Sequence, residues 1–108
     1  MSDPGKAAQE MIQRQIKELD EISSKTIEDL NTVAGSERVA KWKTRTVPLL
    51  AQFVGKKEAQ EFADKRPGPS FTSDLLEEFG DEVDLYRHHL VTLAKKVGSV
   101  PPPAHGSS

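Results

Sequence analysis

The apolar residues of segment 70–98 recur with the spacing of an amphipathic helix. They fall three or four positions apart, at Leu76, Phe79, Val83, Tyr86, Leu90, Leu93 and Val97. This spacing places them along one stripe of a helix, and such a stripe is buried by packing against other helices. We therefore expect a long helix here, built to lie along its neighbours.

The ends of this segment also favour a helix. Side chains that can accept a hydrogen bond from the first backbone N–H groups occur at Ser70, Thr72 and Ser73. Lys95 and Lys96 follow near the other end, where positive charge complements the helix dipole.

Residues 6–33 repeat the same pattern. The stripe comprises Ile12, Ile16, Leu19, Ser23, Thr26, Leu30 and Val33. We expect Gly35 to end this helix, because glycine readily adopts the left-handed conformation, and Ser36 to cap the next one.

The following segment, 36–54, is predicted to be a third long helix. Its stripe comprises Val39, Trp42, Thr46, Leu49 and Phe53. Pro48 lies inside it, so we expect a kink or a broken turn near residues 44–47. Residues 56–65 have enough apolar positions for one short helix, and the prolines of residues 66–69 then impose a loop.

Strand signals are nearly absent from the chain. The prediction is therefore an all-α fold, an antiparallel helical bundle of three long helices plus one short helix. We expect a disordered N-terminus at residues 1–5, the helical bundle at 6–98, and a flexible Pro-rich tail or linker at 99–108.

Composition narrows the classes of function. The net charge of −2 argues against a dedicated nucleic-acid binder. The absence of cysteine excludes disulfides and thiolate metal sites and favours a reducing, cytoplasmic setting. No apolar run approaches the length needed to cross a bilayer, and no secretory signal is present, so no membrane partner is expected.

Catalytic motifs are missing from the polar clusters. Asp84 and His88 stand four apart on one helical face and could share a metal ion, but a catalytic zinc site needs a third protein ligand. The alternative is a solvated helix face with a weak ion pair. A ribonuclease of the HEPN type would need an arginine in register before a histidine, and none stands before His88, His89 or His105. We therefore expect no catalytic residue, no metal and no cofactor.

Two sets of residues could serve recognition. Apolar residues that fall beside the stripes either widen the core or form a partner or self-association surface; the candidate interface residues are Ile22, Ile27, Leu50, Leu75 and Val91. Basic residues could contact an anion or an acidic partner, or could be solvated helix-face charges; these candidates are Lys41, Arg45, Lys56 and Lys57.

One family resemblance emerges between residues 19 and 97. The positions that carry it are Leu19-Asp20-Glu21-Ile22, Trp42, Leu49-Leu50, Phe53, Gly55, Ala59, Phe62, Tyr86, Leu90 and Leu93. They resemble the helical N-terminal region that precedes TIR-like or nucleotide-binding effector domains in predicted bacterial defence proteins. The chain departs from that pattern at Pro48. The resemblance implies a non-catalytic role in assembly, sensing or regulation of an effector.

The leading hypothesis is a non-enzymatic helical interaction or oligomerisation module that regulates an attached or partner effector. The alternative is a small regulatory protein that binds nucleic acid or a nucleotide through a basic face. A third hypothesis, a metal-dependent enzyme, would depend on Asp84 and His88.

Overall fold

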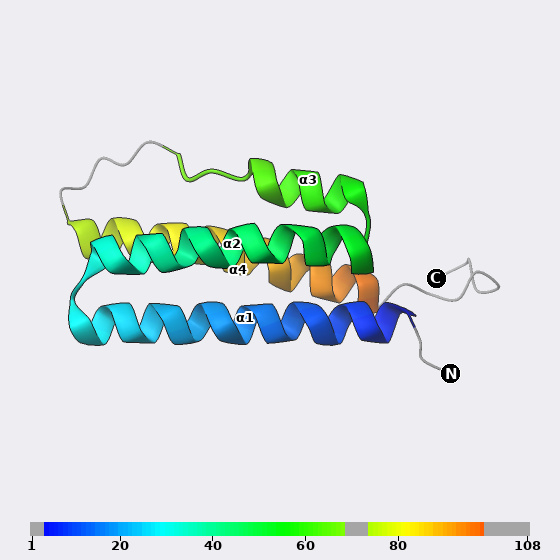
Figure 1. Ribbon diagram of the computed structural model, residues 1–108, viewed down its shortest axis with the longest axis horizontal. Coiled ribbons are helices and arrows are strands. Elements are labelled where there is room, and N and C mark those ends of the chain that lie inside the picture. Colours follow the sequence, from blue (N-terminus) through cyan, green and yellow to red (C-terminus); the bar gives the residue numbers. More distant parts are fainter. Residues whose placement is uncertain (1–3, 69–73, 99–108) are drawn as a thin grey trace.

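A computed structural model describes residues 4–68 and 74–98 of the chain. Within these ranges the regular structure consists of the helices α1 (Pro4–Asp29), α2 (Thr32–Phe53), α3 (Lys56–Asp64) and α4 (Leu75–Gly98). Successive helices run in opposite directions (Figure 1). The predicted all-α bundle of three long helices and one short helix is confirmed. The tail predicted at 99–108 lies outside the described residues.

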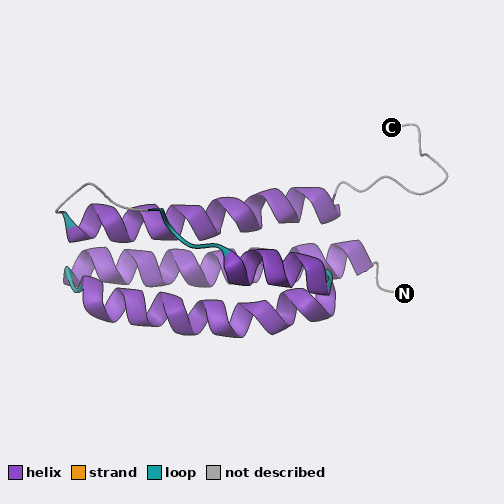
Figure 2. Ribbon diagram, turned by 90° about the horizontal axis from the view of Figure 1, so that it is seen from above, coloured by secondary structure: helices purple, strands orange, loops and turns teal. Residues whose placement is uncertain are grey.

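Helix α1 is the central partner of the bundle, because it packs extensively against both α4 and α2. Helix α3 packs on α2, on the side of the bundle opposite α1 (Figure 1). Seen from above, α3 covers only part of the length of the long helices (Figure 2). One end of the bundle is therefore built from α1, α2 and α4 alone.

Helix α1 begins earlier than the pattern indicated. Pro4 and Gly5 belong to it, so the prediction of a disordered stretch 1–5 is wrong for these two residues, and residues 1–3 lie outside the described part. Proline suits the first position of a helix, because its missing N–H would have no intrahelical partner there.

The turn between α1 and α2 also differs from the prediction. It falls at Leu30 and Asn31, and the side chain of Asn31 caps α2 by accepting a 3.1 Å hydrogen bond from the backbone N–H of Ala34. Gly35 does not end a helix; it is buried inside α2, where a Cβ atom would lie 2.4 Å from the side chain of Thr26. The glycine is needed for the close approach of two helices.

Because the chain turns at Leu30 and Asn31, the last two apolar positions of the stripe predicted for 6–33 do not face the core. Leu30 and Val33, which would be buried on a continuous helix 6–33, are 72% and 68% exposed. Burial in α1 is concentrated in its first two thirds, and Thr26 is buried near its end; the buried residues are Ala8, Met11, Ile12, Gln15, Ile16, Leu19 and Thr26.

Helix α2 continues without a break through Pro48, so the predicted broken turn near residues 44–47 does not occur. The hydroxyl groups of Thr44 and Thr46 donate to the carbonyl groups of Ala40 and Trp42, one helical turn back, at 3.0 and 2.8 Å. Phe53, which was expected in the buried stripe, is 39% exposed.

Helix α3 confirms the predicted short helix, and α4 confirms the helix predicted within 70–98. Asp74 caps α4: its side chain accepts hydrogen bonds from the backbone N–H groups of Leu76 and Glu77 at 3.0 and 3.3 Å. The candidate caps Ser70, Thr72 and Ser73 lie outside the described residues.

The centre of the core is aromatic. The rings of Trp42, Phe62 and Tyr86, from three different helices, lie with centroids 5.8 to 6.2 Å apart. The pairs Trp42–Phe62 and Phe62–Tyr86 meet edge to face, an arrangement that contributes beyond the buried area. These contacts hold α3 against α2 and α4, over the part of the bundle that α3 covers.

Candidate functional site

Four of the five large apolar side chains that are exposed in the described part of the chain gather at the end of the bundle that α3 does not cover; the fifth is Phe53. Ile27, Leu30, Val33 and Leu75 are 53%, 72%, 68% and 62% exposed. We call these four residues the end patch. They come from the last turn of α1, the turn that follows it, and the first turns of α2 and α4, which meet at one end of the molecule (Figure 1).

Val33 and Leu75 also line a common groove between α2 and α4, with a volume of about 480 Å³. Its rim carries Glu37, Glu78 and Glu82. Apolar side chains clustered with a polar rim are typical of surfaces that bind other proteins.

Leu30 has an unusual backbone for its side chain. Its φ angle is 55°, and among the described residues it is the one non-glycine residue with a positive φ. The left-handed conformation costs an L-residue roughly 1–2 kcal/mol, and glycine or asparagine is preferred there. A large apolar side chain is thus held in a disfavoured conformation and exposed to solvent, a combination that breaks two local rules at once.

The predicted interface residues divide into three groups. Ile27 and Leu75 are exposed, as an interface requires. Ile22 and Val91 are partly buried against the core. Leu50 is completely buried, so its assignment to an interface is wrong. Its side chain faces the core.

A second concave surface lies between α1 and α2. It has a volume of about 610 Å³ and is lined by Glu18, Ile22, Arg38, Ala40, Lys41, Thr44 and Arg45. We call it the basic groove, because Arg38, Lys41 and Arg45 follow one another at spacings of three and four along one face of α2. Arg38 was not among the sequence candidates, although its spacing from Lys41 indicates that they share a face.

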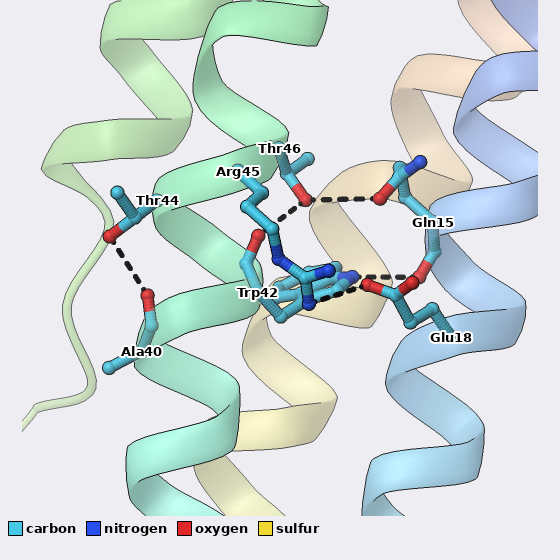
Figure 3. Close-up of polar contacts among 7 residues, drawn as sticks. All are labelled: Gln15, Glu18, Ala40, Trp42, Thr44, Arg45 and Thr46. Carbon is cyan, nitrogen blue, oxygen red and sulfur yellow. Dashed lines mark hydrogen bonds and ion pairs between the residues drawn. The ribbon is translucent and has the colours of Figure 1, made fainter.

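Polar contacts hold the two walls of the basic groove together (Figure 3). The indole N–H of Trp42 donates to the backbone carbonyl of Gln15 at 3.0 Å, in the buried interior. Arg45 forms an ion pair with Glu18 at 2.9 Å near the surface. Thr46 Oγ1 lies 3.4 Å from Gln15 Oε1. The buried contact carries most of the stabilisation, because exposed ion pairs contribute little.

The four predicted anion contacts do not line one site. Lys41 and Arg45 line the basic groove. Lys56 and Lys57 lie in the first turn of α3, on the opposite side of the bundle from α1 (Figure 1). A single basic face made of all four residues does not form.

Lys43 is embedded in a polar cluster between α2, α3 and α4. Its Nζ donates to the backbone carbonyl of Lys65 at 2.6 Å and to the hydroxyl of Tyr86 at 3.4 Å, and it lies 4.6 Å from the centroid of the Tyr86 ring. Burial, with a further contribution from Arg66, lowers the pKa of Lys43. Burial, with Glu82 nearby, raises the pKa of Tyr86 to about 12. The contact of Lys43 with the carbonyl of Lys65 stabilises the end of α3.

His88 and His89, the two histidines that the structure describes, are not part of any cluster of potential metal ligands there. Asp84 and His88 are exposed on α4, and among the described residues no group of three acidic or histidine side chains converges. His89 packs on Phe62 with ring centroids 5.5 Å apart, and burial lowers its pKa.

Comparisons with family models, with curated proteins and with solved structures find no match to this chain. In the described part of the chain, no helix combines the length and the apolar character that crossing a membrane requires. The fold defines a small all-α bundle, and its most distinctive surface features are the end patch and the basic groove.

Proposed function

We propose that this chain is a non-enzymatic helical module that binds another protein, or a second copy of itself, through the end patch. The observation that carries the proposal is Leu30, a leucine held at positive φ and 72% exposed, at the end of the bundle where Ile27, Val33 and Leu75 are exposed too. Burying such a cluster against a partner removes apolar area from water, which is the main driving force of protein association.

The role fits an oligomerisation or regulatory domain of the bacterial defence proteins that the sequence resembles, acting on an attached or partner effector in the cytoplasm. The absence of cysteine is consistent with that reducing setting. The alternative, a nucleic-acid or nucleotide binder with a basic face, receives less support, because its four basic residues are divided between two sides of the bundle.

Leu30→Asn provides the test. Asparagine tolerates the left-handed conformation, so the substitution removes the apolar side chain without disturbing the turn. We expect the parent protein to associate with itself in sedimentation velocity, or to retain in a pull-down a protein that Leu30→Asn loses. A parent that stays monomeric, with no partner whose capture depends on Leu30, would overturn the proposal.

A further inference from the structure

The end patch and the basic groove differ in shape and in charge. The end patch includes a tip, the side chain of Leu30, which is 72% exposed in the turn between α1 and α2 at one end of the bundle (Figure 1). The basic groove is a hollow between the same two helices. A tip and a hollow are complementary shapes, which two copies of either surface alone are not.

The charges around the tip are mostly acidic. Exposed acidic residues flank its apolar side chains at Glu28, Asp29 and Glu37. Lys25 lies 3.9 Å from Asp29 in an exposed pair, which screens that carboxylate only weakly. The tip therefore combines exposed Leu30 with net negative charge.

The basic groove has the opposite charge. Arg38 and Lys41 line it, and within the described part of the chain neither forms an ion pair, whereas Arg45 is paired with Glu18. Its apolar lining includes Ile22 and Ala40, and its volume of about 610 Å³ gives a leucine side chain ample room. An apolar floor with a basic rim matches an apolar tip with an acidic rim.

The tip cannot reach the groove of its own molecule. Arg38, the residue of the basic groove nearest to the tip along α2, is five residues from Val33, about 7.5 Å at 1.5 Å per residue, and both surfaces are parts of the same packed helix pair, so Leu30 cannot turn back into the groove. Any contact between them must join two molecules.

We infer that the occupant of the basic groove is the end patch of a second copy, in a head-to-side contact. This inference rests on the proposed interaction function and specifies its partner. Because the two surfaces differ, the contact is heterologous: each bound copy leaves one tip and one groove open, so assembly continues into longer oligomers or closes into a ring. The contact is small, so we expect an affinity on the order of micromolar or weaker.

Two variants, each lacking one surface, test the arrangement. Leu30→Asn removes the tip and keeps the groove. Arg38→Glu combined with Lys41→Glu reverses the charge of these two groove positions and keeps the tip. Each alone should sediment as a monomer at concentrations where the parent associates, with affinity reduced about tenfold or more for Leu30→Asn. Circular dichroism and thermal unfolding establish that both variants are folded.

Mixing the two variants at equal concentration is the decisive step. The intact tip of one should enter the intact groove of the other, giving a one-to-one complex that grows no further. Lys57→Glu, a charge reversal on exposed α3, is the matched control and should associate like the parent. Raised salt should weaken the complex, because the rim charges are exposed.

Several results would overturn the inference. If the parent associates but the mixture stays monomeric, the contact is not head-to-side, although the proposed interaction function stands. If the parent is monomeric while another protein binds through Leu30, the second copy is not the occupant. If Leu30→Asn associates as the parent does, both the inference and the role of the end patch fail.

Discussion

Replacing Gly35 by alanine tests the packing that places the end patch. The added Cβ atom would lie 2.4 Å from both Cγ2 and Oγ1 of Thr26 and 2.9 Å from its Cβ. Thr26 is completely buried, and its Cβ is fixed to the backbone, so α1 and α2 must move apart to admit the methyl group.

The size of the effect follows from two opposing contributions. Overpacking a well-packed site costs about 1–3 kcal/mol, whereas alanine gains about 0.5–1 kcal/mol over glycine inside a helix. We expect Gly35→Ala to lower the free energy of unfolding by about 1–2 kcal/mol, a fall of roughly 5–15 °C in melting temperature.

Gly80 provides the matched control. It lies inside α4 with no atom within 4 Å of an added Cβ, so Gly80→Ala should raise stability by about 0.5–1 kcal/mol. Urea unfolding monitored by far-UV circular dichroism measures both variants. Thr26→Ala should partly rescue Gly35→Ala, because it removes both atoms at 2.4 Å. A Gly35→Ala variant as stable as the parent would refute the close approach.

Three further predictions concern stability. Leu30→Asn should raise the free energy of unfolding by up to about 1 kcal/mol in the monomer, since asparagine suits the φ of 55°; a loss would contradict the turn geometry. Lys43→Met should lower it by about 0.5–1.5 kcal/mol in urea unfolding, because the backbone carbonyl of Lys65 loses one of two donors and keeps the guanidinium of Arg66 at 2.9 Å; an unchanged midpoint would show that the Lys43 contact is dispensable. His89 has a lowered pKa, so the unfolded chain binds a proton first as pH falls through 6.5 and the folded state loses stability. His89→Gln should reduce that acid-induced loss, whereas His88→Gln should keep it; equal behaviour of the two variants would refute the assignment.

The helix stripes were predictable because burial imposes a regular spacing. In α4 the stripe positions Phe79, Val83, Tyr86, Leu90 and Leu93 are all buried, as a spacing of three and four residues requires. The short helix α3 was predictable from its boundaries, Gly55 and the prolines that follow it.

The turn between α1 and α2 was not predictable, because two signals compete within six residues. Asn31 is as good a helix cap as Ser36, and Gly35 suits either a helix end or a close approach of two helices. The choice depends on the fit of Gly35 against Thr26, a contact between distant turns that no local pattern contains.

This same misplacement concealed the candidate site. On a helix continuing to residue 33, Leu30 and Val33 belong to the buried stripe, so only Ile27 and Leu75 of the end patch could be predicted as interface residues. Leu50 was misjudged for the converse reason: it lies beside the stripe of α2, but the core is wide enough to bury it. Whether an apolar residue is core or surface depends on which helix covers it, and α3 covers only one end of the bundle.

A dilution series followed by NMR tests the central claim most directly. As the protein concentration rises, we expect amide shifts in two regions alone: the end patch around Leu30, including the start of α4 at Leu75, and the wall of the basic groove around Arg38 and Lys41. The amides of α3 should stay unchanged. Shifts confined to α3, or none up to millimolar concentration, would contradict association through the end patch.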